Sequence, residues 1–255
     1  MRSPLCWMGG KSRLAQKIVG LIPQHEAYAE VFAGGAWVFF SKPESKYESI
    51  NDVNSDLVVF YRVLQYHLEE FCRQFKFLLS SREWFGDWNR QLAAGGLTDV
   101  QRAARFYYLQ RHCFSGDIID RSFGRSTLKA PRINLVRMEE ELSAVHLRMS
   151  LVTVENLPWQ HYIKRYDSAK TFFYCDPPYY GFESIYGKDI FARDDFALLA
   201  DCLGRIAGKF LMSINDVPDI REIFGKFNVR EVTTTYCSRK IASSANELLI
   251  GNYAL

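Results

Sequence analysis

One aspartate, Asp176, stands between a run of apolar, mostly aromatic residues and two prolines. The run over 172–175 predicts a buried strand, because aromatic side chains suit a covered pleated surface. Pro177 and Pro178 cannot donate to a sheet, so the strand ends there, and each disfavours helix in the residue before it. The predicted result is a stiff turn that presents a carboxylate, backbone carbonyls and the Tyr179 ring at the carboxyl end of a strand, where α/β sheets bind ligands. The alternative is an ordinary strand-ending turn with an exposed acid.

A glycine turn and a second acid have the spacing of a nucleotide site. A strand predicted over 27–32 runs into Ala33 and Gly34 and then into a helix, and such glycines let a ligand approach the backbone. A second strand, predicted over 47–51, ends at Asp52, where an acid can hydrogen-bond a ribose. This pairing predicts an adenosine-containing ligand. The alternative is that Asp52 caps the helix that follows it.

The N-terminal Gly-Lys-Ser sequence at 10–12 suggests a phosphate-binding P-loop, but that motif requires glycine where Leu5 stands and a strand before it. The P-loop is therefore excluded. What remains is a glycine turn that delivers Lys11, with Trp7 nearby, ahead of a helix that Ser12 is expected to cap. The alternative is an ordinary glycine turn.

Strands and helices alternate at both ends of the chain, which is typical of an α/β protein with a mainly parallel sheet. We expect further strands over 150–155, 210–214, 229–237 and 247–253, and helices over 57–80, 98–111, 196–206 and 218–224. The last two strands are joined by a basic, serine-rich loop predicted over 238–246, with no helix between them, so they predict an antiparallel hairpin at the edge of the sheet. The interruption over about 60–145 predicts an inserted, mainly helical lobe in one α/β domain formed by 1–59 and 146–255.

Composition excludes several classes of protein. Hydrophobic residues make up 48% of the 255 residues, enough for a sizeable core. Six scattered cysteines form no C-x-x-C pair, so we expect neither zinc nor a disulfide framework, and no metal. The absence of a signal peptide and of a long apolar run predicts a cytoplasmic protein with no membrane partner.

Charge is concentrated in the predicted lobe. The net charge is +3, but the segment 102–137 holds eight Lys and Arg against two Asp, a net of +6, which leaves −3 on the remainder. Such a basic segment predicts a surface that binds nucleic-acid phosphates, the alternative being a solvated surface without a partner. The candidate DNA-binding residues are Arg111, Phe114, Ser115, Arg121, Arg125, Lys129 and Arg132.

The order of these parts resembles the Dam-type (D12 class) adenine-specific DNA methyltransferases over nearly the whole chain. The resemblance rests on five segments: Trp-Met-Gly-Gly-Lys at 7–11, Glu-Val-Phe-Ala-Gly-Gly at 30–35, Asp-Val-Asn-Ser-Asp-Leu at 52–57, Asp-Pro-Pro-Tyr at 176–179, and Glu-Leu-Leu-Ile-Gly-Asn-Tyr at 247–253. It implies a Rossmann-like, S-adenosylmethionine-dependent methyltransferase fold, with a target-recognition lobe between the cofactor and catalytic halves.

The resemblance also implies roles for particular residues. The S-adenosylmethionine site would include Trp7, Lys11, Phe32, Ala33, Gly34, Asp52 and Asp176, and we add Glu155, the acid at the end of the predicted strand 150–155. Asp176 and the Pro177 carbonyl would accept the two N–H bonds of an adenine amino group, with Pro178 fixing the turn. Tyr179 would stack on a base turned out of double-stranded DNA.

Some positions depart from the family pattern. Ala36 stands where the family usually has a second glycine, and Leu-Gln-Arg at 109–111 stands where it commonly has Leu-Asn-Arg. After Gly116 no arginine occurs at the spacing that Dam-type enzymes use to read guanine. Either Arg121 or Arg125 substitutes from a shifted register, or the target is not GATC. Phe114 and Ser115 either wedge the duplex or pack in the protein.

The predicted activity is methyl transfer to adenine N6 in double-stranded DNA, by a monomer or weak dimer associated with the nucleoid of a bacterial or phage-infected cell. One alternative is a methyltransferase acting on RNA or a protein amide through a similar turn. The other is a catalytically silent DNA-binding relative.

Overall fold

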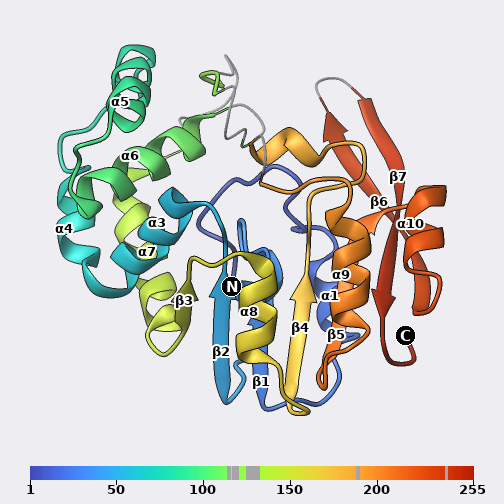
Figure 1. Cartoon of the computed structure of the whole chain (residues 1–255). Helices are drawn as coiled ribbons and strands as arrows, with labels where there is room; N and C mark the ends of the chain where they lie inside the picture. The colour runs from blue at the N-terminus through green and yellow to red at the C-terminus, as the bar shows by residue number, and fades with distance from the viewer. Residues whose placement is uncertain (114–115, 117–120, 125–132, 188–189, 239–240) are drawn as a thin grey trace.

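The structure is a computed structural model that describes residues 1–113, 116, 121–124, 133–187, 190–238 and 241–255 (Figure 1). A seven-stranded sheet lies between two layers of helices. Its strand order is β3-β2-β1-β4-β5-β7-β6. The strands span Ala27–Glu30 (β1), Tyr47–Asn51 (β2), Thr153–Glu155 (β3), Thr171–Cys175 (β4), Lys209–Asn215 (β5), Asn228–Ser238 (β6) and Ile241–Gly251 (β7).

The sheet is parallel from β3 to β5 and antiparallel beyond it. β1 pairs in parallel with both β2 and β4, and β4 pairs in parallel with β5. β7 runs antiparallel to both β5 and β6. This confirms the predicted α/β fold, a mainly parallel, Rossmann-like sheet with an antiparallel hairpin at its edge. The hairpin is longer than predicted, because most of the expected loop at 238–246 belongs to β7 and pairs with β6.

Two buried clusters cover the two faces of the sheet. Side chains alternate across β4, so Phe172 and Tyr174 join one cluster while Phe173 and Cys175 join the other. Helices α8 (Trp159–Tyr166), α9 (Asp195–Leu203) and α10 (Pro218–Ile223) pack on the second face. The first face is covered by α1 (Ala15–Val19), α2 (Trp37–Ser41) and the helices that follow. Within the described residues, no helix is long and apolar enough to cross a membrane.

The helices between β2 and β3 gather beside the β2–β3 side of the sheet (Figure 1). They are α3 (Ser55–Tyr66), α4 (Leu68–Arg73), α5 (Arg82–Ala94), α6 (Asp99–His112) and α7 (Leu135–Met149). The predicted helix over 57–80 is broken at His67. The predicted start of α6 is confirmed: Thr98 accepts from the Gln101 amide, and the Gln101 side chain accepts from the Thr98 amide.

Apolar residues of these helices share a buried cluster with the sheet. Phe60, Phe106 and Met138 belong to the same cluster as Tyr28 and Phe172 on β1 and β4. The helical region and the sheet therefore stabilise each other through one continuous core. The division at 59–60 and 145–146 stays a prediction.

The expected cap of the first helix is wrong. Helix α1 begins at Ala15, with Leu14 at its N-cap position, and no side chain caps it. The residues between Lys11 and α1 form hydrogen-bonded turns instead: the amides of Leu14 and Ala15 both donate to the Lys11 carbonyl, at 3.0 and 2.7 Å. The turn that delivers Lys11 is thus held by its own backbone.

Candidate functional site: a pocket at the carboxyl ends of the parallel strands

A pocket of about 420 Å³ opens at the carboxyl ends of β1, β2 and β4. From β1 the chain order in the sheet runs one way to β2 and β3 and the other way to β4 and β5. The pocket lies at this reversal, where the connections diverge to opposite faces and leave a crevice. Its volume is in the range of small-molecule sites.

Most of the residues predicted for a cofactor line this one pocket. Those that do are Trp7, Lys11, Phe32, Ala33, Gly34, Asp52 and Asp176, together with Pro178 from the predicted catalytic turn. They come from four separate stretches of chain, which the fold of the sheet brings together at one pocket. Glu155 is not among the lining residues: its carboxylate accepts from the Tyr166 hydroxyl at 2.9 Å and faces Arg165 at 3.5 Å. Its assignment to a cofactor stays a prediction.

Asp176 is held through one of its two carboxylate oxygens. The Lys11 ammonium, whose side chain is 3% exposed, lies 2.7 Å from Oδ1, and the Ser213 hydroxyl donates to the same oxygen at 3.1 Å. Among the described residues, none donates to Oδ2. Burial raises the pKa of Asp176, and the nearby Glu247 raises it further, while Lys11 and the Ser213 hydrogen bond oppose the shift. The result is an ionisable carboxylate with one oxygen committed and one open.

The turn after Asp176 brings an aromatic ring over the same cation. The Lys11 Nζ atom lies 4.8 Å from the centre of the Tyr179 ring. Pro177 and Tyr179 do not line the pocket, whereas Pro178 does. Tyr179 is half-buried, and its carbonyl accepts from the Phe182 amide at 2.8 Å. The predicted catalytic turn therefore borders the pocket at its rim.

Asp52 links the glycine turn to the end of β2. Its Oδ2 accepts from the Gly34 amide at 2.8 Å, and its Oδ1 accepts from the Asn54 amide at 2.9 Å. Burial raises the pKa of Asp52, and these backbone bonds oppose the shift. The side chain that caps α3 is Asn54, which accepts from the Leu57 amide, so the capping alternative for Asp52 is wrong.

The glycine turn is shaped by close contact with Trp7. Gly34 has φ +46°, and a Cβ there would lie 2.5 Å from the Trp7 Nε1 atom. Ala36, at the position where the family usually has glycine, also adopts a left-handed conformation with φ 50°. That conformation costs an alanine on the order of 1 kcal/mol. The turn therefore keeps its glycine-type geometry despite the alanine.

A buried acid that the sequence did not single out stands at the end of β1. Glu30 lines the pocket and is 2% exposed; its Oε2 accepts from the Tyr28 hydroxyl at 2.5 Å and the Phe39 amide at 3.0 Å. Burial raises the pKa of Glu30 to about 8, and the charge of Asp176 adds to the shift. Two acids at the ends of adjacent strands thus share one desolvated region.

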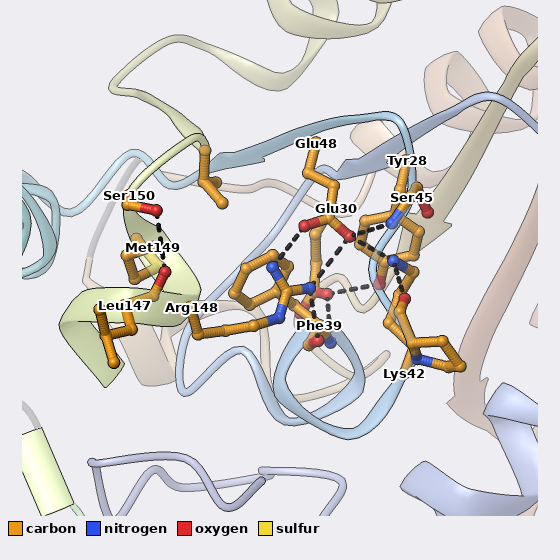
Figure 2. A network of polar contacts seen from close by, with 12 residues as sticks. Tyr28, Glu30, Phe39, Lys42, Ser45, Glu48, Leu147, Arg148, Met149 and Ser150 are labelled. Atoms are coloured by element: carbon orange, nitrogen blue, oxygen red, sulfur yellow. Dashed lines mark hydrogen bonds and ion pairs between the residues drawn. The ribbon is translucent and has the colours of Figure 1, made fainter. Parts of the chain in front are cut away.

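Behind Glu30 a polar network ties β1 and β2 to α7 (Figure 2). The Glu48 carboxylate accepts from Lys42 and from Arg148, with the second Arg148 nitrogen at 2.9 Å. The Arg148 guanidinium also lies 3.9 Å from the centre of the Phe39 ring. Because the Phe39 amide donates to Glu30, the network supports the wall of the pocket from outside it.

Asn51 is another positioning group that sequence reasoning missed. Its side-chain nitrogen donates to the carbonyls of Val31 and Leu157, at 3.0 and 3.1 Å, and its oxygen accepts from the Leu157 amide at 2.9 Å. One amide therefore joins three stretches that line the pocket. The available signal was an amide side chain at the last position of a strand just before the predicted ribose acid.

The predicted DNA-binding residues are only partly described. Arg111 donates to the Pro4 carbonyl at 3.4 Å and lies 5.9 Å from the Tyr107 ring centre. Arg121 donates to Asn89 at 3.4 Å and lies 6.0 Å from the Phe106 ring centre. Both arginines are half-buried residues that lie beside aromatic rings of α6. The remaining candidates, Phe114, Ser115, Arg125, Lys129 and Arg132, lie outside the described residues.

The end of α6 is joined to the N-terminal segment. The buried Gln110 donates to the carbonyls of Cys6 and Gly116, at 3.0 and 2.7 Å. Gly116 has φ +73°, and a Cβ there would lie 2.8 Å from the Cys6 carbonyl oxygen. The segment that delivers Trp7 and Lys11 to the pocket is therefore packed directly on the end of α6.

The described residues contain no group of three or more His, Cys, Asp or Glu side chains arranged to hold a metal ion. The pocket combines an open carboxylate oxygen, a backbone turn without side chains and apolar walls. Such an arrangement can hold a ligand with an adenosine-like part at Asp52 and place its reactive part near Asp176.

Comparison with known proteins identifies relatives over the whole chain. A DNA N-6-adenine-methyltransferase of Escherichia phage P1 is 30% identical over 88% of this chain, which spans 31% of that protein. The type II methyltransferase M1.LlaDCHI of Lactococcus lactis subsp. cremoris is 26% identical, over 97% of this chain and 94% of its own length. The type II methyltransferase M.CviBI of Paramecium bursaria Chlorella virus NC1A is 25% identical, over 99% of this chain and 100% of its own.

The family model of the D12 class N6 adenine-specific DNA methyltransferases matches residues 7–237. That range begins at Trp7, which packs against the Gly34 turn, and includes the pocket, the helices α3 to α7 and the turn at Asp176. The match therefore covers every residue that lines the pocket. The chain belongs to the D12 class of N6 adenine-specific DNA methyltransferases.

Proposed function

We propose that the pocket binds S-adenosylmethionine and that the enzyme transfers its methyl group directly to N6 of an adenine turned out of double-stranded DNA. The observation that carries this proposal is the open Oδ2 of Asp176, at the rim of a pocket that also contains the Gly34 turn and Asp52. An acceptor for the amino group and a site for the donor thus share one wall.

The residues of the pocket fit the donor in chemical type. Asp52 keeps lone pairs beyond its two backbone bonds and can accept from ribose hydroxyls. Gly34 has no side chain, and Trp7, which also lines the pocket, fills the space where its Cβ would stand. Apolar walls that include Phe32 and Phe191 suit the remainder. When bound, S-adenosylmethionine supplies an electrophilic methyl group on a sulfonium.

The catalytic turn addresses the weak nucleophilicity of adenine N6, whose lone pair is delocalised into the ring. Asp176 Oδ2 and the Pro177 carbonyl would each accept one N–H of the amino group, which favours a pyramidal nitrogen with its lone pair free. Because Oδ1 is committed to Lys11 and Ser213, the carboxylate cannot rotate without breaking two contacts. The acceptors are therefore fixed before the base arrives, which is electrostatic preorganisation.

Two further contacts support the same reaction. The Lys11 ammonium, 2.7 Å from Asp176, stabilises the ionised form that must accept the N–H bonds. The half-buried Tyr179 ring, at the rim, would stack on the extruded base, because an amino group inside the duplex cannot be approached in line. The basic segment around α6 would hold the duplex by its phosphates.

The proposal is tested by incubating the protein with isotopically labelled S-adenosylmethionine and duplex DNA of mixed sequence, and by mapping N6-methyladenine by sequencing. We expect label in adenine within one short sequence. The Asp176→Ala variant should lose transfer while retaining DNA binding in a mobility-shift assay. The absence of transfer by the wild type over a range of salt, pH and DNA sequences would contradict the proposal.

A further inference from the structure

Strand β5 carries two polar side chains toward the catalytic turn. Ser213 and Asn215 are two residues apart, so they lie on the same face of the strand at its carboxyl end. Neither was part of the predicted site. The Ser213 side chain is fully buried, accepts from the Tyr174 hydroxyl at 2.7 Å and donates to Asp176 Oδ1 at 3.1 Å.

Asn215 forms a double contact with the turn itself. Its side-chain oxygen accepts from the Tyr180 amide at 2.9 Å, and its side-chain nitrogen donates to the Tyr180 carbonyl at 3.1 Å. Tyr180 directly follows the stacking residue Tyr179. The side-chain amide of Asn215 thus binds both the backbone N–H and the backbone carbonyl of Tyr180, as the backbone of a neighbouring strand would.

This contact replaces a backbone ladder that cannot continue. The parallel pairing of β4 with β5 ends at Cys175 opposite Met212. The next segment contains Pro177 and Pro178, which have no N–H to donate to β5. Without another anchor, the residues that should hold the adenine amino group would leave the sheet as a free loop.

We propose that Ser213 and Asn215 are positioning residues for methyl transfer: Ser213 fixes the orientation of the Asp176 carboxylate, and Asn215 docks the Asp-Pro-Pro-Tyr turn onto β5. The inference rests on the proposed function of that turn. Ser213 directs one oxygen of Asp176 away from the substrate, so that Oδ2 faces it. Asn215 sets the height of the Pro177 carbonyl and of the Tyr179 ring above the pocket.

The chain supplies a matched control at the other end of the same strand. The Asn252 side chain accepts from the Phe210 amide at 3.0 Å and donates to the Gly208 carbonyl at 3.0 Å. This is the same two-bond contact with backbone, placed near the amino end of β5 and away from the pocket lining. Asn252→Leu therefore reports what the loss of such a contact does to stability alone.

The test measures the single-turnover rate constant for methyl transfer at saturating S-adenosylmethionine and DNA, with thermal stability and the dissociation constants for S-adenosylhomocysteine and DNA. We expect Asn215→Leu to lower the rate constant about 100-fold, as for a misplacement on the order of 1 Å, with both dissociation constants within about threefold of wild type. Asn215→Asp keeps an acceptor for the Tyr180 amide, so its rate constant should lie between those of wild type and Asn215→Leu. Asn252→Leu should lose about as much thermal stability as Asn215→Leu does, and should keep the wild-type rate constant.

Ser213→Ala has a separate signature in the pH dependence. The groups that act on Asp176 from neighbouring segments are Lys11, Glu247 and Glu30. Loss of the donated hydrogen bond raises the pKa of the carboxylate further, so the acid limb of the single-turnover profile should move to higher pH. A purely structural role for Ser213 would lower the rate equally at every pH.

The outcomes separate the two proposals. If the wild type transfers no methyl group, the proposed function fails. If the wild type is active and Asn215→Leu retains its rate constant, or loses it no more than Asn252→Leu does, the positioning role of Asn215 is overturned. An unshifted acid limb in Ser213→Ala overturns the role of Ser213.

Discussion

The proposed catalytic edge of the sheet, which carries Asp176 and Asp52, and the proposed recognition helices α3 to α7 hold their polar groups in different ways. At the edge, Asp176 receives two donors from two different elements, and Asp52 receives two backbone amides. In and after α6, Arg111 donates to the Pro4 carbonyl and Arg121 donates to Asn89, each over 3.4 Å, and both lie beside aromatic rings. Bonds of that length are weaker than those of 2.7 to 3.1 Å that hold Asp176 and Asp52. We propose that the acceptors for the reaction are fixed in advance, whereas contact with DNA requires these arginines to exchange partners.

The largest expected effect comes from removing the cation at the catalytic edge. Lys11→Met leaves Asp176 buried without its counter-ion, so the pKa of the carboxylate should rise further and its ionised fraction at neutral pH should fall. We expect transfer to drop at least about 100-fold at pH 7 and to recover in part as pH rises. A pH–rate profile of the single-turnover reaction checks this. Lys42→Met, which breaks a buried ion pair outside the pocket lining, should instead lower stability more than rate.

Glu30 tests whether burying an acid at the catalytic edge makes the stability of the protein depend on pH. Its pKa, about 8, is above the ordinary value of 4.5, so the folded state binds the extra proton. The contribution of Glu30 to stability is complete at pH below 4.5 and decreases by about 1.4 kcal/mol per pH unit up to pH 8. Glu30→Gln keeps an acceptor and removes this dependence. The melting temperature of wild type should therefore fall relative to the variant between pH 5 and 8, and parallel curves would show that Glu30 is ionised throughout.

Arg121 tests the other side of the comparison. Arg121→Ala should raise the Kd for DNA roughly tenfold and reduce its salt dependence, while the single-turnover rate constant at saturating DNA stays near wild type. If Arg121 reads a base, the loss should fall on the target sequence and spare unrelated duplexes. A loss of rate at saturating DNA would place Arg121 with the catalytic edge instead.

The smallest expected effect concerns stability alone. Thr98→Ala removes the side chain that caps α6 and should lower the free energy of unfolding by about 1 kcal/mol. Because the cap is at the start of the helix, and Arg111 and the Gln110 contact are near its end, transfer by the folded enzyme should not change. Denaturant unfolding and a transfer assay at 25 °C measure the two effects separately.

The sequence predicted those parts of the site that depend on local chemistry. Asp176 could be proposed as a site residue because two prolines end a strand directly after it. Asp52 could be proposed because it follows the strand after the glycine turn. Asn51, Ser213 and Asn215 were not found, since the backbone groups that they bind come from segments joined to them only through the sheet. A polar residue in a strand shows that a partner must exist, but not which one.

The fold was predictable in class and less so in detail. Alternating strands and helices were sufficient for the parallel sheet. The basic, serine-rich composition of 238–246 predicted a loop, but residues 241–246 pair with β6 and are strand, because backbone ladder bonds do not depend on side-chain polarity. The bounds of helices α5 and α7 were not predicted from the sequence. The buried faces of these helices are set by packing on α6 and α3, which the sequence alone does not show.

The contact of the N-terminal segment with Gln110 and Gly116 has a consequence for the order of folding. Cys6 meets its partner 104 residues later, and Lys11 meets Asp176 later still. During synthesis from the N-terminus, at 5–20 residues per second, the segment that carries Lys11 waits on the order of ten seconds for its carboxylate. The pocket is therefore assembled late, by the closure of very long loops, after α3 to α7 have been synthesised.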